Sequence, residues 1–456
     1  MHLRSASLLL LPTLAFAQAP SYARERARID SVVSAEVSGT PIAGVAIAVV
    51  KGRDTIMMKG WGLADVENDV PVSPASVFRI GSVTKQFTSA AIMQLVEKGR
   101  LSLAGTLGAL LPNMPAAWRP VTLRQLLNHT SGIPSYTDIG PRWQRRWRDD
   151  MLPDSLLAFT TTDTMDFAPG SKWRYDNTGY VLLGMILDKT TGTRYPKYLQ
   201  EQLFKPLGLT STMYCYVQPL IKHRALGYQR MGKALVNAEY LSMTQPYSAG
   251  ALCSTVGDLV NWTRALHGGT VVSAATFMQM TTPTGAAVRA HYGFGLGVDS
   301  LNGHPRIAHS GGIHGFQSML AYYPKDSLTV VVLANSSPSP VDLLAGNLAR
   351  VMLALPLEGV AQPRVVLSSA QLTQFVGDYA VQLPNANTLV MHVTVAGDRL
   401  MAQGEGQGAF ELIPYGNNTF GAEFDRSLRV TFVVENGRAT RITVRQGGVD
   451  MEGPRR

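Results

Sequence analysis

Arg79-Ile80-Gly81-Ser82-Val83-Thr84-Lys85-Gln86-Phe87-Thr88 is the sequence on which the predicted fold and chemistry of this chain mainly rest. A glycine turn is expected to open a helix here, with Ser82 and Lys85 one turn apart on the same face. A serine hydroxyl is a weak nucleophile, and an amine in a desolvated pocket can lose its proton and help to activate it. The alternative is an ordinary helix start, with Lys85 in solvent. The stretch therefore predicts covalent serine catalysis, if partner residues occur elsewhere.

Composition and charge restrict the class of protein. The chain has 456 residues, of which 45% are hydrophobic, so it can bury a large core and is expected to form two or more domains. The net charge of +9 is spread thinly, without the basic and aromatic runs that nucleic-acid binding requires. There are two cysteines, Cys215 and Cys253, and the sequence leaves open whether they pair.

The N-terminus has the features of a secretory signal peptide. Arg4 supplies positive charge, a short apolar run follows, and Ala15-Phe16-Ala17 is a cleavage site of the small-x-small type. The apolar run is well short of the ~20 residues that a membrane-spanning helix needs. We therefore expect residues 1–17 to be removed, and the mature protein to be periplasmic or secreted, without a membrane span.

The order of the predicted elements indicates an α/β (α+β) fold. Residues 22–36 are expected to form a helix, and the buried helix that follows Ser82 is expected to end at Gly99. Helices in the middle and strands at both ends predict an antiparallel sheet whose two ends meet, flanked by helices and carrying a helical subdomain. The expected strands are 44–50, 55–58, 292–298, 306–312, 318–323 and 328–333.

The texture of the sequence changes after this region. A segment rich in proline and glycine, placed at 356–365, is expected to be a linker between a domain at 18–355 and a small all-β, barrel-like domain at 366–456. Short alternating segments separated by turns support the second domain. No internal repeat stands out.

Two further motifs give the opening stretch its partners. Tyr175 and Asn177 lie two residues apart on a tight loop before a helix, so both can point into one cleft. The sequence His309-Ser310-Gly311 closes a predicted strand. Lys85 is the only lysine with a serine three residues before it, whereas Tyr-x-Asn occurs again at 415–417 and His-x-Gly also begins at 267 and 291.

The order of the three motifs closely resembles that of the serine β-lactamase and penicillin-binding-protein superfamily, in its class C-like serine hydrolase branch. The resemblance covers roughly residues 25–350 and implies a β-lactamase/transpeptidase-like fold. The C-terminal part resembles, with weaker motifs, the lipocalin-like β-domain appended to some members. Further segments similar to this branch are 126–132, 169–170, 175–180, 206–209 and 249–250.

The resemblance also implies roles for the site residues. Ser82 would be the nucleophile, Tyr175 the general base, and Lys85 the cation that lowers the pKa of the tyrosine. Asn177 would hold Lys85 and the substrate amide. The remaining assignments are an oxyanion hole formed by the backbone N–H groups of Ser82 and Gly312, and a substrate-binding wall that contains His309 and Gly311. No cofactor and no metal are implied.

Two departures from the family pattern bear on the substrate. His309 stands where these enzymes commonly have a lysine, so the permanent cation that would bind a substrate carboxylate is replaced by a largely neutral group. Asp176 stands where a serine or alanine is often found. We consider two interpretations of Asp176: its side chain faces solvent, or its charge favours substrates that carry an amine.

Two other features have competing interpretations. His129, in the turn Asn128-His129-Thr130-Ser131-Gly132, is either a general base or a hydrogen-bonded structural residue, and the second is favoured because no acidic partner is close in sequence. Trp143, Trp147 and the arginines around them form either a helix face that covers the core, which is favoured, or a lid that contacts the substrate.

The sequence therefore predicts an exported serine hydrolase that forms an acyl-enzyme on Ser82 with small esters, amides or D-amino-acid peptides. A β-lactamase or a D-Ala-D-Ala carboxypeptidase is the alternative. The second alternative is a non-catalytic, penicillin-recognising sensor or binding protein. The expected partner is a small-molecule or peptide substrate, and the oligomeric state is left open.

Overall fold

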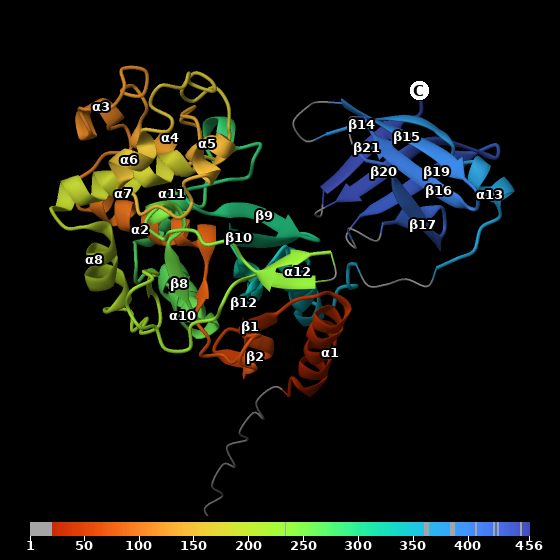
Figure 1. Ribbon diagram of the computed structural model, residues 1–456, viewed down its shortest axis with the longest axis horizontal. Coiled ribbons are helices and arrows are strands. Elements are labelled where there is room, and N and C mark those ends of the chain that lie inside the picture. Colours follow the sequence, from red (N-terminus) through yellow and green to blue (C-terminus); the bar gives the residue numbers. More distant parts are fainter. Residues whose placement is uncertain are drawn as a thin grey trace, which may run out of the picture.

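The computed structural model describes residues 21–232, 234–359, 364–383, 388–405, 408–422, 425, 428–446 and 449–456 (Figure 1). The predicted signal peptide at 1–17 lies outside these residues, as does part of the predicted linker. Within the described ranges, no helix combines the length and the apolar character needed to cross a membrane.

A seven-stranded antiparallel sheet organises the larger part of the chain. Its central pair joins strands from the two ends of the region, because β1 pairs with β12 from Val45 opposite Ala334 to Lys51 opposite Leu328. The expectation that the two ends of the sheet meet is therefore confirmed. In spatial order the strands are β3 (Val70–Pro71), β2 (Asp54–Asp65), β1 (Gly44–Lys51), β12 (Leu328–Ala334), β11 (Phe316–Tyr323), β10 (His304–Ile313) and β9 (Gly297–Leu301).

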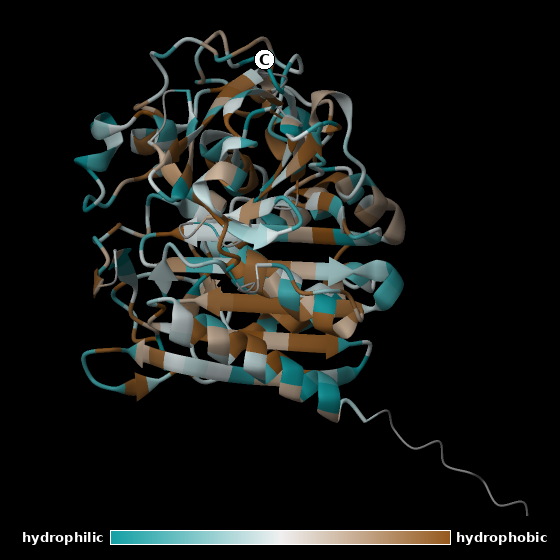
Figure 2. Cartoon of the chain, turned by 90° about the vertical axis from the view of Figure 1, so that its right-hand side faces the viewer, coloured by the Kyte–Doolittle hydropathy of each residue, from teal (hydrophilic) through white to brown (hydrophobic). Residues whose placement is uncertain are grey.

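Both faces of this sheet are buried, and the residue pattern of β1 shows why. Val45, Ile47 and Val49 point to one face, where α1 (Ala23–Gly39) and α12 (Val341–Met352) cover them. Ala46 and Ala48 point to the other face, where α10 (Val256–His267) packs on β1 and β12. The apolar strands of the sheet are mainly brown in Figure 2. Strands buried on both faces read as continuous apolar runs, as this one does.

The helical subdomain is inserted between β2 and β9 and contains the buried helix α2 (Thr84–Glu97), against which α7 (Asn177–Thr191) packs. Its other helical segments are short. They are α3 (Leu107–Leu110), α4 (Leu123–Leu127), α5 (Pro141–Gln144), α6 (Pro153–Leu157), α8 (Tyr195–Leu199), α9 (Tyr247–Gly250) and α11 (Ala274–Met280).

One predicted strand is partly wrong. The strand expected at 292–298 begins only at Gly297, because residues 293–296 form a turn in which the Gly293 N–H donates to the Leu296 carbonyl. Gly295 has a φ of +70°, and a Cβ there would lie 2.6 Å from the Lys85 carbonyl oxygen. Only glycine fits both the left-handed backbone and the close approach to α2.

The C-terminal strands form a separate eight-stranded antiparallel sheet, seen in blue in Figure 1. The first and last strands, β14 (Gly377–Gln382) and β21 (Val449–Pro454), approach each other, and the Arg456 N–H donates to the Asp378 carbonyl, so the sheet is a nearly closed barrel. Phe375, Phe420 and Phe432 fill its interior with ring centroids 4.9 to 5.4 Å apart. The predicted barrel-like, all-β fold is confirmed. The strands between are β15 (Thr388–Ala396), β16 (Arg399–Gly404), β17 (Phe410–Gly416), β18 (Thr419–Gly421), β19 (Arg429–Glu435) and β20 (Arg438–Gln446).

Candidate active site

Ser82 lies in a tight turn that leads into α2. Residues Gly81–Val83 form one 3₁₀ turn, and Gly81 has a φ of +49°. A Cβ on Gly81 would come within 2.9 Å of the backbone nitrogen of Gly312. The glycine therefore lets the end of β10 lie directly against the turn that carries Ser82, where a side chain would separate the two.

Lys85 is fully buried and lies beside Ser82. Its Nζ is 3.2 Å from Ser82 Oγ, and it donates to Asn177 Oδ1 and to the Ala249 carbonyl oxygen, each at 2.8 Å. The alternative of a solvated lysine at an ordinary helix start is thus wrong. Burial lowers the pKa of Lys85 well below its usual value, and the charge of Asp176 opposes this only in part.

Tyr175 completes the group from the loop before α7. Lys85 Nζ lies 4.7 Å from the centroid of the tyrosine ring. The hydroxyl is buried, and within the described part of the chain no hydrogen-bond partner reaches it. Burial raises the pKa of Tyr175, and the nearby Ser82 side chain lowers it by a smaller amount. Burial thus favours the neutral forms of both Tyr175 and Lys85.

Asn177, the first residue of α7, has a fixed orientation. Its Oδ1 accepts from Lys85, its Nδ2 donates to Thr137 Oγ1 at 3.1 Å, and its backbone N–H donates to Ser135 Oγ at 3.1 Å. The structure therefore brings four predicted site residues, Ser82, Lys85, Tyr175 and Asn177, into one group.

Asp176 does not face solvent, so that interpretation is wrong. Its side chain is buried and caps α7, with Oδ2 accepting from the Gly179 N–H at 3.0 Å and from Ser131 Oγ at 3.1 Å. It is not among the residues that line the pocket described below. Burial raises the pKa of Asp176 to about 7, against the lowering effect of the hydrogen bonds it accepts.

His309 lies behind the pocket. Its Nε2 is 2.7 Å from the Tyr292 hydroxyl, and its Nδ1 is 2.6 Å from the Ser310 carbonyl oxygen. A carbonyl can only accept, so Nδ1 carries the proton and Nε2 accepts from the tyrosine. Burial, reinforced by Lys85, lowers the pKa of His309 to about 4. The imidazole is thus neutral and already occupied by two partners.

Gly311 and Gly312 lie against the turn that carries Ser82. A Cβ on Gly311 would lie 2.1 Å from the Ile80 carbonyl oxygen, so this position also requires close backbone contact. Gly312 has open space on its Cβ side and lines the pocket together with Ser82. The two backbone segments proposed for the oxyanion hole are therefore adjacent.

A pocket of about 470 Å³, open to solvent, leads down to Ser82. Aromatic and apolar side chains form much of its wall, and no Asp, Glu, Lys or Arg is among its lining residues. Trp143 is one of them, and it also packs against the hydrophobic core, as the favoured interpretation of this segment predicted. The lining comprises Gly81, Ser82, Tyr136, Thr137, Trp143, Asn177, Leu241, Pro246, Ala249, Gly250, Gly312, Ile313 and His314.

Gln245 holds Trp143 in this wall. The indole Nε1 donates to Gln245 Oε1 at 2.7 Å, and Gln245 Nε2 donates to the carbonyls of Arg146 and Asp149. Arginines of the same segment point outward, where Arg142 pairs with Asp163 at 2.6 Å. In the described ranges, no group of three His, Cys, Asp or Glu residues is placed to hold a metal ion.

The profile of the beta-lactamase family matches residues 29–354. The chain belongs to the beta-lactamase family. Members of this family are serine hydrolases, and the grouping of Ser82, Lys85, Tyr175 and Asn177 has the composition that such chemistry requires. The predicted resemblance is confirmed, and so is the expectation of an enzyme of the serine hydrolase class.

Two relatives are similar to this chain in sequence. It is 29% identical to the protein flp of Staphylococcus aureus (strain COL) over 70% of this chain and 65% of that protein, so the chain spans slightly less than two thirds of the length of that relative. It is 27% identical to penicillin-binding protein 4* of Bacillus subtilis (strain 168), over 84% of this chain and 88% of that one.

Two solved structures are also similar. The octameric penicillin-binding protein homologue from Pyrococcus abyssi has a TM-score of 0.66 at 25% identity and covers 94% of this chain and 99% of its own. A D-stereospecific amidohydrolase from Streptomyces sp. has a TM-score of 0.62 at 27% identity, over 72% of this chain and 97% of its own.

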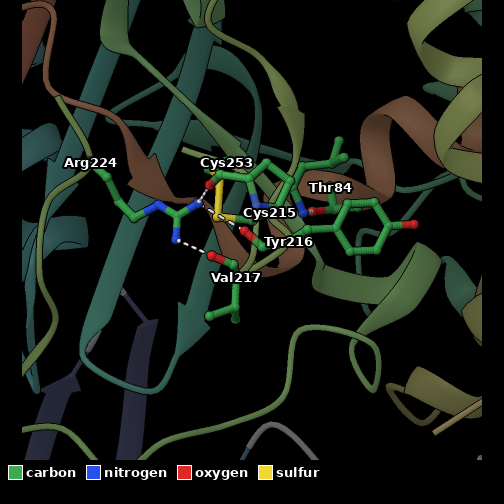
Figure 3. The surroundings of a disulfide bond; sticks show 8 residues. Thr84, Cys215, Tyr216, Val217, Arg224 and Cys253 are labelled. Carbon is green, nitrogen blue, oxygen red and sulfur yellow. Dashed lines mark hydrogen bonds between the residues drawn. A yellow bond between two sulfur atoms is a disulfide. The ribbon is translucent and has the colours of Figure 1, made fainter. Parts of the chain in front are cut away.

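A disulfide bond joins Cys215 and Cys253 near the beta-lactamase-type site (Figure 3). The sequence left open whether these two cysteines pair, and the structure shows that they do. Cys253 lies in β8 (Leu252–Ser254), which pairs with β4 (Phe78–Arg79) just before Ser82. The Cys215 N–H donates to the Ala251 carbonyl at 2.8 Å, two residues after the carbonyl that accepts from Lys85. The bridge therefore ties together segments that position both Ser82 and Lys85.

Sequence reasoning missed most of the pocket wall. Tyr136, Leu241, Ile313 and His314 come from a 3₁₀ turn, a loop and the end of β10, none of which carries a motif, and tertiary folding alone brings them together. Gln245 also carried no signal, because a buried glutamine with several partners looks like any other glutamine in sequence. Ala249, in contrast, lies in the pair Ala249-Gly250, which resembles a family signature.

Proposed function

We propose that this protein is an exported serine hydrolase that forms an acyl-enzyme on Ser82 with small esters, amides or D-amino-acid peptides. The observation that carries the proposal is the buried Lys85 Nζ, 3.2 Å from Ser82 Oγ and hydrogen-bonded to two carbonyl oxygens. The non-catalytic sensor is disfavoured because a recognition site has no need of a buried amine beside a serine hydroxyl.

The hydrogen bonds of Lys85 suggest how Ser82 is activated. A neutral amine has two N–H groups and one lone pair. The oxygens of Asn177 and Ala249 each accept one N–H, which leaves the lone pair directed towards Ser82. Because burial lowers the pKa of Lys85 and raises that of Tyr175, we propose an amine and a phenol as the resting pair, with Lys85 as the base for Ser82 in place of Tyr175, to which the family resemblance gave that role.

The proposed reaction then proceeds in two acyl-transfer steps. Ser82 Oγ attacks the substrate carbonyl carbon while its proton moves to Lys85, and the backbone N–H groups of Ser82 and Gly312 stabilise the oxyanion. Each such donor contributes about 3 kcal/mol in the transition state. The Tyr175 hydroxyl donates a proton to the leaving group and regains one from Lys85. Water then attacks the acyl-enzyme by the reverse route and releases the acid.

The pocket favours uncharged substrate groups. It has no lysine or arginine in its lining, and His309, in the position where a lysine is common, is neutral and bonded to Tyr292. A substrate carboxylate would lose its hydration here without gaining a cation. We therefore prefer ester or amide hydrolysis over β-lactamase or carboxypeptidase activity. The similarity to a D-stereospecific amidohydrolase supports amides of D configuration as substrates.

The experiment is a substrate panel assayed with the wild type and Ser82→Ala. We expect turnover of p-nitrophenyl esters and D-amino-acid amides, slow or no turnover of nitrocefin, and fluorophosphonate labelling that disappears in the variant. Labelling that persists without Ser82 would refute the assignment. Efficient nitrocefin hydrolysis without esterase activity would reverse the preference among substrates.

The predicted export has its own test. Expressed with its native N-terminus in a Gram-negative host, the protein should be recovered from the periplasm or medium with Gln18 as its first residue. Recovery from the cytoplasm with an intact N-terminus would contradict this part of the proposal.

A further inference from the structure

His129 holds the backbone on both sides of Tyr175. Its carbonyl oxygen accepts from the Arg174 N–H at 3.0 Å, and its ring Nδ1 accepts from the Asp176 N–H at 3.1 Å. The imidazole also packs on the ring of Tyr175, with the two centroids 4.4 Å apart and the planes inclined by 39°. One residue thus contacts the backbone N–H groups of Arg174 and Asp176, on either side of Tyr175, and also the tyrosine ring.

His129 has an unfavourable backbone conformation and, within the described residues, an unsatisfied ring nitrogen. Its φ is +60°, a left-handed conformation that is uncommon for residues other than glycine. Because Nδ1 accepts a hydrogen bond, the ring proton is on Nε2, and that nitrogen is buried without a partner in the described part of the chain. Backbone strain and an unsatisfied buried N–H both cost stability, and such features cluster at functional sites.

The surroundings keep the imidazole neutral, as an Nδ1 acceptor must be. Burial lowers the pKa of His129 well below its usual value, and Lys85 and His309 lower it further, while the hydrogen bond from the Asp176 N–H raises it. The groups that face the ring are aromatic or titratable: Lys85, Trp173, Tyr175, Asp176, Tyr180, Tyr292 and His309.

We propose that His129 is a positioning residue for the proton-transfer step, and that it acts by holding the Tyr175 hydroxyl beside Ser82 and Lys85. This inference rests on the proposed function. His129 itself does not reach the nucleophile by any hydrogen bond found in the described residues. Its favoured interpretation as a hydrogen-bonded structural residue is confirmed, and the inference assigns that structural contact to the alignment of Tyr175.

Two substitutions separate the contributions of the ring and the acceptor. His129→Phe keeps a ring against Tyr175 but removes the Nδ1 acceptor. His129→Asn keeps an acceptor at the equivalent position and removes most of the ring. The matched control is Thr130→Val, which removes the buried hydrogen bond from Thr130 Oγ1 to Asn128 Oδ1 in the same turn without touching Tyr175.

The readouts are kcat and KM for p-nitrophenyl acetate, the rate of fluorophosphonate labelling of Ser82, and the melting temperature. A misplacement of about 1 Å costs roughly 100-fold in rate. We expect His129→Phe to lower kcat and the labelling rate by about 30- to 100-fold with KM within threefold of the wild type. On a logarithmic scale, the loss of kcat and of labelling rate in His129→Asn should be at most two thirds of the loss in His129→Phe. Thr130→Val should lower the melting temperature, while its kcat stays within threefold of the wild-type value.

The inference is overturned if His129→Phe keeps kcat within threefold of the wild type, or if the three variants lose activity in proportion to their melting temperatures. A ¹⁹F NMR measurement with 3-fluorotyrosine at position 175 covers the case of a poorly folding phenylalanine variant. We expect the Tyr175 signal to shift or split in His129→Asn and not in Thr130→Val, and an unchanged signal in both would refute the positioning role. A wild type that neither hydrolyses the ester nor is labelled would refute the proposed function instead, while the NMR result would still test the position of Tyr175.

Discussion

Replacing Asp176 by asparagine tests whether a buried carboxylate weakens the folded state at neutral and alkaline pH. Burial raises the pKa of Asp176 from 3.8 to about 7, so the folded protein holds this proton more tightly than the unfolded chain does. Stability from this residue is therefore fully present below about pH 4 and is lost as the pH rises to about 7. Asparagine keeps an oxygen that can accept from the Gly179 N–H and from Ser131.

The magnitude follows from the pKa difference. A shift of about three pKa units at about 1.4 kcal/mol each corresponds to a loss of about 4 kcal/mol between pH 4 and pH 8. A domain of this length has an entropy of unfolding of about 0.7 kcal/mol/K, so the loss corresponds to about 6 °C in melting temperature. Asp176→Asn should lack this part of the pH dependence, because its side chain does not titrate.

The assay must report on the domain that contains the site. We suggest heating the protein at pH 5 and at pH 8.5 and following the loss of fluorophosphonate labelling at Ser82. The melting temperature of the variant relative to the wild type should rise by several degrees between the two pH values. An equal difference at both pH values would show that Asp176 titrates normally, and the reasoning from burial would fail.

Three further predictions concern Lys85, the disulfide and the pocket wall. Because burial lowers the pKa of Lys85, kcat/KM for an uncharged ester should rise with pH along an acid limb whose pKa is well below 10.5. In Lys85→Arg the side chain stays protonated, so this limb should disappear and kcat/KM should fall by at least 1000-fold. The bridge between Cys215 and Cys253 closes a loop of 38 residues, so replacing both by serine should lower the free energy of unfolding by about 4 kcal/mol in urea titrations, with kcat at 25 °C within threefold. Trp143→Ala should raise KM about tenfold for esters of aromatic acids and less than threefold for acetate esters, and equal effects on both would argue against contact between Trp143 and the acyl group.

The parts of the site that were predictable are those in which residue type and spacing carry the information. Ser82 and Lys85 lie one helical turn apart, so their proximity follows from local geometry. The position of Asn177 in the site was predictable because Asn177 stands at the start of a helix. The sheet was predictable because its apolar strands alternate with clear turns. The error at 292–298 arose because the glycine pattern resembles a strand, whereas Gly295 is needed for contact with α2.

The protonation states of the site residues could not be predicted from the sequence, because they depend on burial in the folded protein. In sequence, Asp176 is simply a charged residue on a loop, and both interpretations that we considered assumed that it stays charged. In the structure it caps α7 from inside the domain, where the low dielectric opposes its charge. The same applies to Lys85, whose two carbonyl partners come from segments 92 and 164 residues away.

Burial favours the neutral form of Lys85, Tyr175, His129 and His309 near Ser82, and this common effect is relevant to catalysis. It lowers the pKa of Lys85, His129 and His309 and raises that of Tyr175, so each of these groups is driven towards its neutral form. Groups that are driven towards their neutral forms would screen little of the charge that appears on the substrate oxygen in the proposed attack by Ser82. In such a low dielectric, a fixed N–H donor stabilises the oxyanion far more than it would in water. In the proposed mechanism, the environment that lets Lys85 act as a base for Ser82 would therefore also strengthen the proposed oxyanion hole, and it would do so most for substrates that bring no charge of their own.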